Sequence, residues 1–291
     1  MSGKPLFIIA IGLIIYGTIG IMSKDDNQTE STGFWDKVSE FFKSDEYNDD
    51  EVEYEEYDET LYGSSEIIQY PDYSLFYNAS NPRIAYMGRF VYDEDGSVRF
   101  NYPGSSIIAN FKGNYIGVKM RAGSGSFMVS LDGGEPERWE FGEDTDVMYV
   151  DSLSAGPHSI RIMLATEGYA HNPTFYGFRL CGEKALLEKP ILNGLKFLFI
   201  GNSITCGYGV EDDDPKHGFD YLTENHYYSY AAITARYFNA QWHSISRSGI
   251  GVYRNYGDKR EGSRINMTQQ FHRTLFDNES YTWDHRSYQP N

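Results

Sequence analysis

Cysteine and positive charge are both scarce in this sequence of 291 residues. Two cysteines, Cys181 and Cys206, are too few for a disulfide-held scaffold. We expect free, buried thiols, and a bridge between the two stays open for an exported protein. Lysine and arginine number 25 against 42 acidic residues, which gives a formal net charge of -17. This charge repels phosphates and anionic lipid headgroups, so it excludes nucleic acid as a partner and an anionic membrane surface as a resting place.

Several motifs that bind phosphate or present a nucleophile are missing as well. The glycines Gly201, Gly207 and Gly209 do not form G-x-G-x-x-G, and no Lys-Ser/Thr pair follows them. Dinucleotide and P-loop binding are therefore not supported. The residues around Ser203 do not form G-x-S-x-G, so the nucleophile elbow of α/β-hydrolases is not matched either.

The N-terminal part of the sequence predicts an exported protein. Residues 5–22 are continuously apolar, and at about 1.5 Å per residue they are long enough to cross a bilayer core. We interpret residues 1–23 as a signal anchor, with a cleaved signal peptide as the alternative. Residues 24–66 are strongly acidic and predict a disordered linker, because like charges repel and little apolar surface is available for burial.

Residues 67–187 show the pattern of a β-sandwich. An Asp95-Gly96 turn separates two apolar runs, and Ile116, Val118 and Met120 alternate with polar neighbours. A second alternating run ends at Asp132-Gly133-Gly134, and 158–168 and 173–182 predict two further strands. Short strands without a helical pattern between them favour two packed antiparallel sheets.

Residues 188–291 show a different pattern, which predicts the beginning of a parallel α/β sheet. Residues 195–201 form a nearly continuous apolar run, which is typical of a strand buried on both faces. Residues 226–239 have helical spacing, through Tyr227, Tyr230 or Ala231, Ile233 or Thr234, and Tyr237. Residues 240–249 predict a second strand. Strand, helix and strand in this order favour a βαβ unit.

Ser203 comes just after the first of these strands, where reactive groups collect in open α/β sheets. This position suits a nucleophile with an exposed hydroxyl and a firmly held backbone. Gly249 lies just past the second strand, and its N–H is a candidate donor to an oxyanion. From spacing alone, a plain turn is the more common reading of a strand-ending Gly-x-Ser.

Two motif blocks resemble a known family. "FIGNSITCGYGVE", residues 199–211, resembles the first block of the SGNH (GDSL-like) hydrolases, whose Gly-Asp/Asn-Ser provides the nucleophile. Residues 225–257 are similar to the carbohydrate esterase family 2 acetylesterases, and "NYPGSSIIANFKG" resembles the jelly-roll sandwich that precedes their SGNH domain. The resemblance covers about residues 80–291. It implies a jelly roll followed by a three-layer α/β/α domain, and an enzyme that removes O-acetyl groups from polysaccharides without a metal or cofactor.

The resemblance also assigns roles to individual residues. Ser203 is expected to be the nucleophile, with its own N–H and that of Gly249 in the oxyanion hole. Asn202 stands where most of the family has Asp and is expected to organise the loop. Tyr208, Tyr253 and Arg254 are candidates for the substrate cleft, with loop packing as the equally acceptable alternative.

The family's catalytic His block, by contrast, is not found. None of the seven histidines matches it, and His243 is expected to pack inside a strand, while His217 and His226 are expected at the surface or at a helix start. We therefore predict that the sequence is the N-terminal part of a longer enzyme and is inactive alone. The alternative is a non-catalytic, membrane-anchored protein that binds carbohydrate.

Overall fold

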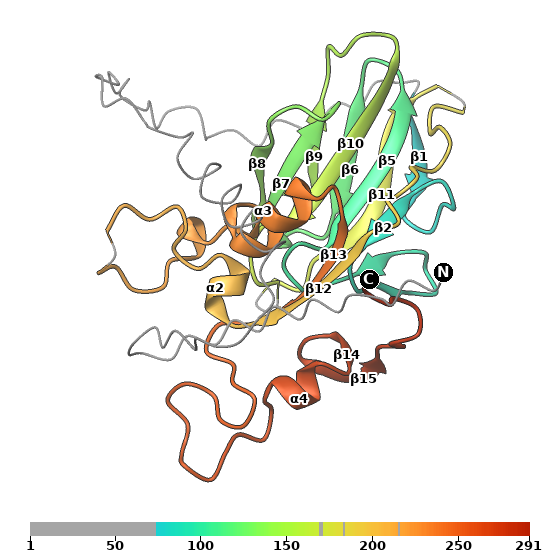
Figure 1. Cartoon of the computed structure of the whole chain (residues 1–291). Coiled ribbons are helices and arrows are strands. Elements are labelled where there is room, and N and C mark those ends of the chain that lie inside the picture. The colour runs from blue at the N-terminus through green and yellow to red at the C-terminus, as the bar shows by residue number, and fades with distance from the viewer. Residues whose placement is uncertain (1–73, 169–170, 183, 215) are drawn as a thin grey trace, which may run out of the picture. The chain divides into compact units, whose positions relative to one another are not determined.

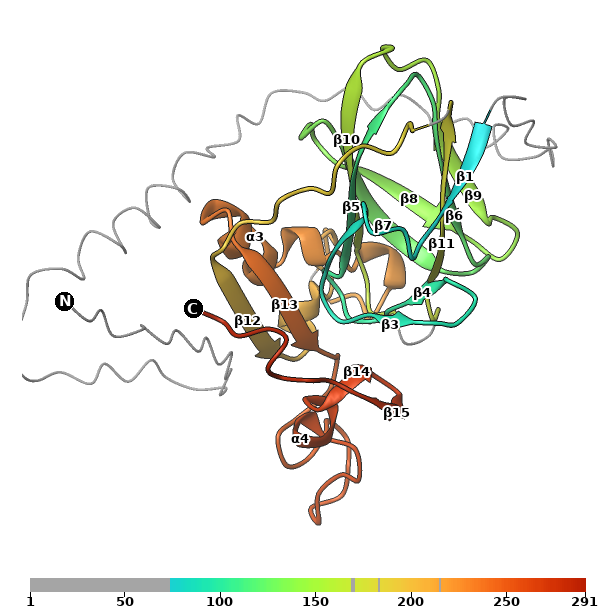
Figure 2. The same ribbon diagram turned by 90° about the vertical axis from the view of Figure 1, so that its right-hand side faces the viewer.

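The computed structural model describes residues 74–168, 171–182, 184–214 and 216–291. Two antiparallel sheets make up the first half of this region (Figures 1 and 2). One sheet has the order β3-β4-β11-β6-β9, with β1 also paired to β11. Its strands are β1 (Ser74–Asn78), β3 (Val91–Tyr92), β4 (Val98–Arg99), β6 (Ile116–Met120), β9 (Val147–Val150) and β11 (Thr174–Cys181).

The other sheet has the order β2-β5-β10-β7-β8. Its strands are β2 (Ala85–Met87), β5 (Ser106–Lys112), β7 (Gly125–Leu131), β8 (Glu137–Phe141) and β10 (Pro157–Leu164). Side chains from both sheets form one apolar core, in which Ile116 and Val118 of β6 lie with Ile160 and Ile162 of β10. The predicted pair of packed antiparallel sheets is therefore present.

The two predicted turns are also found in this region. The N–H of Gly96 donates to the carbonyl of Asp93, and β3 pairs with β4 across this turn. The Asp132-Gly133-Gly134 turn joins β7 to β8, which are paired antiparallel. Asp and Gly are suited to these positions because both tolerate left-handed backbone, and Asp132, Gly96 and Gly133 all have positive φ.

The second half contains the predicted parallel strand pair, β12 (Lys196–Gly201) and β13 (Gln241–Ser246). Between them lie the short helix α2 (Ser203–Cys206), the 3-10 turns η2 (Tyr221–Thr223) and η3 (His226–Tyr228), and the helix α3 (Tyr230–Tyr237). After β13 come α4 (Met267–Gln270) and the hairpin β14 (Arg273–Leu275) and β15 (Asn278–Thr282).

Two details of this half correct the sequence analysis. The apolar run of β12 was expected to be buried on both faces, but only Phe199 is fully buried, because β13 is the only strand that pairs with β12 among the described residues. The helical spacing offered Tyr230 or Ala231 for one face of the helix, together with Tyr237. In α3, Ala231, Ala232 and Ala235 are buried, Tyr230 and the preceding Tyr227 of η3 pack partly buried against the same cluster, and Tyr237 is exposed.

The outer face of the five-stranded sheet packs against the βαβ unit. Met87, Ile108 and Met163 from the sheet share a cluster with Trp242 of β13 and the buried alanines of α3. In Figure 1, α3 lies in front of this sheet. This apolar contact fixes the strand pair, and therefore the edge that carries Ser203, against the sandwich.

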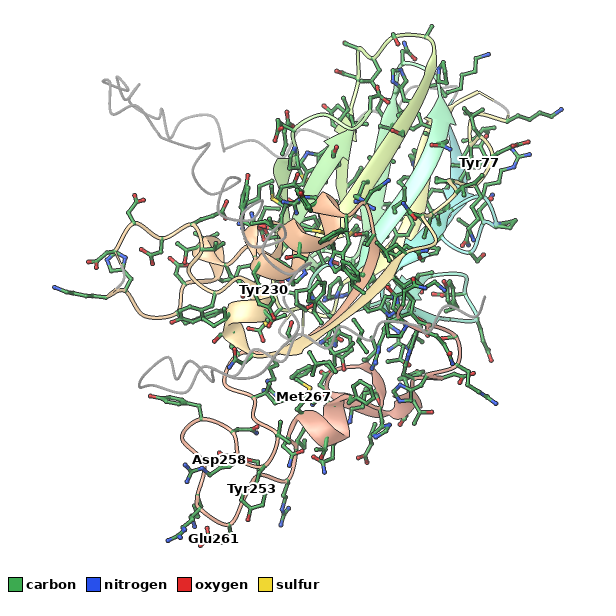
Figure 3. The ribbon with its side chains drawn as sticks, viewed as in Figure 1. Tyr77, Tyr230, Tyr253, Asp258, Glu261 and Met267 are labelled. Carbon is green, nitrogen blue, oxygen red and sulfur yellow. The ribbon has the colours of Figure 1, made fainter. Side chains whose placement is uncertain are left out.

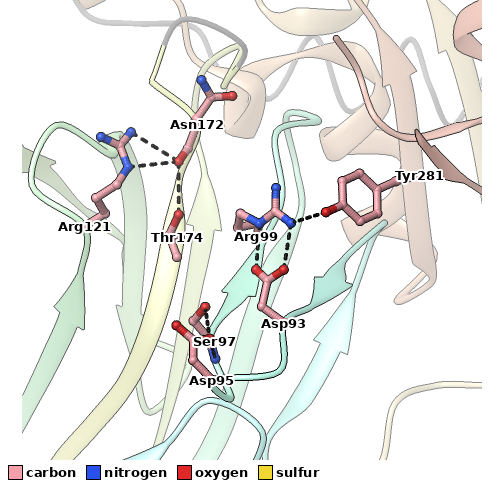
Figure 4. Close-up of polar contacts among 8 residues, drawn as sticks. All are labelled: Asp93, Asp95, Ser97, Arg99, Arg121, Asn172, Thr174 and Tyr281. Carbon is pink, nitrogen blue, oxygen red and sulfur yellow. Dashed lines mark hydrogen bonds and ion pairs between the residues drawn. The ribbon is translucent and has the colours of Figure 1, made fainter. Parts of the chain in front are cut away.

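A polar contact joins the hairpin β14–β15 to the six-stranded sheet (Figure 4). The guanidinium of Arg99 donates to both carboxylate oxygens of Asp93, at 2.6 and 2.7 Å, and also to the hydroxyl of Tyr281, at 2.8 Å. The Arg99 carbon Cζ also lies 4.9 Å from the centre of the Tyr281 ring. Fork-shaped pairing of this kind fixes direction as well as distance.

The described ranges contain no helix with the length and apolar character needed to cross a bilayer. The expected anchor or signal peptide at 1–23 and the acidic linker at 24–66 lie outside the described residues. Cys181 and Cys206 are not joined in a disulfide within the described residues, as favoured by the sequence. Cys206 is fully buried, but Cys181 is only half-buried because it is the last residue of β11.

Candidate active site

The parallel register of β12 and β13 places the two predicted reactive residues at one edge of the sheet. Gly201 pairs with Ser246, and the N–H of Arg247 then donates to the carbonyl of Gly201 at 3.4 Å. Ser203 follows Gly201 by two residues, and Gly249 follows Ser246 by three. Both loops therefore leave the sheet at the carboxyl ends of its strands, where an active site is expected.

Ser203 is the first residue of α2 and is half-buried. The side chain of Asn202 caps this helix and accepts a hydrogen bond from the N–H of Ile204 at 3.2 Å. The carbonyl of Ser203 accepts from the N–H groups of Gly207 and Tyr208, both at 3.0 Å. The backbone on both sides of the hydroxyl is therefore held, as a nucleophile requires.

Two glycines allow this loop to pack closely. A Cβ atom on Gly201 would lie 2.0 Å from Thr205 Oγ1, whose hydroxyl in turn pairs with Tyr230 at 2.9 Å. A Cβ on Gly207 would lie 2.3 Å from the carbonyl oxygen of Asn225, and Gly207 has a φ of 95°. Any larger side chain at either position displaces the turn that carries Ser203.

Gly249 has a φ of 74°, which favours glycine. A Cβ there would meet only Tyr256 Cβ at 3.7 Å, an ordinary contact. A glycine was expected here because a Cβ atom would crowd the approaching backbone. Among the described residues there is room for a Cβ atom, and the positive φ is the stronger reason for glycine. The carbonyl of Gly249 accepts from the N–H of Tyr256 at 2.7 Å, which fixes the peptide that follows it.

The three candidate cleft residues lie on two different loops. Tyr208 is half-buried, and its ring centre lies 5.3 Å from that of Phe219. Tyr253 is 66% exposed, and its hydroxyl donates to the carbonyl of Glu261. Figure 3 shows Tyr253 with Asp258 and Glu261 on a loop that extends away from the strands, and Arg254 follows on the same loop. The described contacts do not link Tyr253 or Arg254 to Ser203.

Each of the seven histidines has a hydrogen-bond or ring partner other than the Ser203 hydroxyl. His226 Nδ1 pairs with the carbonyl of Thr205 at 2.8 Å, and its Nε2 accepts from Trp242 Nε1 at 3.3 Å. His226 was expected at the surface or a helix start; it starts η3 but is completely buried, and burial lowers its pKa to about 4. The others contact the following groups: Asp132 (His158), the Tyr221 ring (His171), Asp212 (His217), the Tyr288 ring (His243), and each other (His272 and His285).

His243 is buried in β13, as predicted from the strand pattern. Its ring is stacked on Tyr288, with 3.5 Å between centres, and burial lowers its pKa to about 3. Among the described residues, then, no imidazole is positioned to take the proton of Ser203. A serine hydroxyl needs such a base to become an efficient nucleophile.

A cluster of buried acidic groups beside α2 was not predicted from the sequence. The ligand atoms of Glu167, Cys206 and Glu224 lie within 4.8 Å of one another, and all three residues are buried. Glu167 follows β10 and Glu224 precedes η3, so they are 57 residues apart in sequence. No local pattern indicates their meeting, because the packing of the sandwich on the βαβ unit brings them together.

Comparisons with known proteins agree with the family resemblance. The sequence model of the carbohydrate esterase 2 N-terminal family matches residues 86–190. "Cellulase/esterase CelE" of Acetivibrio thermocellus is 36% identical over 179 residues, which are 61% of this chain and 22% of that protein. An "acetylxylan esterase / glucomannan deacetylase" of Cellvibrio japonicus is 29% identical over 73% of this chain and 59% of its own length.

A solved structure shows the same similarity in three dimensions. A family two carbohydrate esterase from Clostridium thermocellum, in complex with cellohexaose, has a TM-score of 0.63 and 31% identity. The match covers 71% of this chain and 63% of that one. The chain thus spans less than two thirds of each of these proteins. The chain resembles carboxylic-ester hydrolases. Its resemblance to carbohydrate esterase family 2 is confirmed.

Proposed function

We propose that this chain contains the nucleophile and oxyanion loop of a serine esterase that removes O-acetyl groups from polysaccharides of the acetylated xylan or mannan type. The observation that supports this most is the shared edge of β12 and β13, which carries Ser203 and Gly249 in a chain similar to family 2 esterases. We further propose that residues 1–23 direct export and anchor the protein to a membrane.

In this proposal, the Ser203 hydroxyl attacks the carbonyl carbon of a sugar acetate. The N–H groups of Ser203 and Gly249 stabilise the negative oxygen that develops. Collapse releases the sugar hydroxyl and leaves an acetyl group on Ser203, and water then releases acetate. No step requires a metal or cofactor.

The histidine contacts support a second proposal, that the 291-residue chain alone turns over slowly or only binds carbohydrate. Each imidazole has other neighbours, so no imidazole among the described residues is placed to accept the Ser203 proton. Non-catalytic binding of polysaccharide is therefore the alternative function.

Acetyl transfer separates the two functions. The chain is incubated with 4-nitrophenyl acetate with and without added imidazole, which can act as an external base. We expect one acetyl group on the peptide containing Ser203, formed faster with imidazole, and none on Ser203→Ala. Acylation that persists equally in Ser203→Ala contradicts the esterase proposal. Retention of acetylated xylan on a column by both proteins, with no acylation of either, supports the binding function.

A further inference from the structure

Two buried carboxyl groups connect the sandwich to the loop that carries Gly249. Glu167 is 3% exposed and Glu224 is 0% exposed. The Oε1 atom of Glu167 accepts a hydrogen bond from the N–H of Ser248 at 2.6 Å. The Oε1 atom of Glu224 accepts from the N–H of Glu167 at 3.2 Å. Each acid thus uses one oxygen to hold a backbone amide.

The second oxygen of each acid is buried without a hydrogen-bond donor among the described residues. Two ionised carboxylates this close in a dry interior repel strongly, so one of them must hold a proton. A proton on one acid removes one of the two charges.

The surroundings indicate which acid holds the proton. Burial raises the pKa of both, and the pKa of Glu224 rises to about 9, with the charge of Glu167 adding to the effect. At Glu167 the Ser248 N–H and the positive charge of Arg247 oppose the rise. At Glu224 the positive charge of Arg138 opposes the rise in pKa, although its guanidinium donates to Glu211 and to the backbone carbonyl of Glu224. The other titratable groups that act on the pair or are affected by it are Cys206 and Tyr221.

We propose that Glu167 is a positioning residue, whose carboxylate holds the Ser248–Gly249 loop while the neighbouring Glu224 is protonated. A charge-assisted hydrogen bond at Ser248 fixes the backbone one residue before the expected oxyanion donor. The sandwich thereby contributes directly to the geometry of the active site. The catalytic part of this inference depends on the proposed function, whereas the loop-holding part does not.

The alternative role of these groups is to bind a cation. Two carboxylates and a thiol are within reach of one another, which is a possible donor set for a divalent metal such as zinc. Neutral variants distinguish a metal site from a pair in which one acid is protonated. A metal needs both charges, whereas the pair with one protonated acid needs only the charge of Glu167.

The test compares amide variants of the two acids in the full chain, by amide hydrogen exchange at Ser248 and by thermal unfolding. Glu224→Gln supplies a permanent N–H in place of the acid proton, so we expect exchange at Ser248 close to that of the wild type. Glu167→Gln replaces a charged acceptor with a neutral one, and we expect exchange about fivefold faster. Glu167→Met has no acceptor and should exchange faster still.

The N–H of Arg247, which donates to Gly201, is the internal reference for general loosening of the loop. Equal effects of the two Gln variants, or a larger effect of Glu224→Gln, would overturn the proposal. So would a stoichiometric metal in the wild type that is lost in Glu224→Gln. Acetyl transfer to Ser203 should be slowed more by Glu167→Gln than by Glu224→Gln. The concentration of 4-nitrophenyl acetate that gives half the maximal rate should stay unchanged. If the wild type does not acylate at all, the esterase proposal fails, and the exchange data still decide the role of Glu167 in holding the loop.

Discussion

Gly201 of β12 and Ser246 of β13 occupy the same position in the parallel register, and both are the last residues of their strands. The loops that carry Ser203 and Gly249 therefore start at one level of the sheet. The Ser203 loop is held by backbone hydrogen bonds and the Asn202 cap, and the Gly249 loop by backbone hydrogen bonds and the Glu167 carboxylate. This makes the site sensitive to small changes at its glycines.

Gly201→Ala is expected to destabilise the protein. The new Cβ would meet Thr205 Oγ1 at 2.0 Å, and that hydroxyl is held by Tyr230. We expect the free energy of unfolding to fall by about 1–3 kcal/mol, as for other overpacked sites. Urea denaturation measures the change. Gly194→Ala, where a Cβ meets nothing within 4 Å, is the matched control and should be neutral.

At Gly249 the backbone angle, rather than space, should decide which residues are tolerated. Ala at a φ of 74° is expected to cost about 1–2 kcal/mol of unfolding free energy. Asn visits the left-handed region more readily, so Gly249→Asn should be closer to the wild type. Urea denaturation of both variants gives the order. Equal losses for Asn and Ala would mean that crowding by neighbours matters more than φ.

The stability of the protein should respond to acid through His243. Its pKa is about 3 in the folded protein, below the ordinary value of about 6.5. Below about pH 6.5 the unfolded chain binds a proton that the folded chain does not, so stability falls as pH falls. His243→Phe removes the titrating imidazole and keeps an aromatic ring stacked on Tyr288. As the pH falls from 7 to about 5, the free energy of unfolding of the variant should therefore rise by about 2 kcal/mol relative to that of the wild type.

Urea denaturation across this pH range gives both curves, and other titrating groups cancel in their difference. Parallel curves for wild type and His243→Phe would show that the imidazole does not stay neutral when folded.

Arg89 should contribute to stability through hydrogen bonds to the segment around α4 and β14. It is 1% exposed, and its Nη1 atom donates to the carbonyls of Phe271 at 2.8 Å and Arg273 at 2.6 Å. Arg89→Met leaves these carbonyls without their donor and should cost about 2–4 kcal/mol, with Arg89→Lys in between. Thermal unfolding gives the order. Arg286→Met is the control, because its ion pair with Asp284 is exposed. A similar small loss for both Met variants would contradict the role of Arg89.

The sequence alone was enough to predict the two-sheet arrangement, the turns at Asp95-Gly96 and Asp132-Gly133-Gly134, and the parallel pair around Ser203. Alternation of apolar residues and turn chemistry act over a few neighbouring residues, so they can be read locally. The same holds for the packing of His243, which lies within a strand pattern. The resemblance to family 2 esterases added roles for Ser203 and Gly249 that spacing could not give.

Only the tertiary structure decided how the strands of the βαβ unit are covered and which groups meet beneath the site. β12 is half-buried because its neighbours, rather than its own apolar run, determine its burial. The alanines of α3 are its fully buried residues, with Tyr230 partly buried and Tyr237 exposed, because the outer face of the five-stranded sheet approaches one side of the helix closely. Glu167 and Glu224 come together only through this packing, since two side chains 57 residues apart share no local pattern.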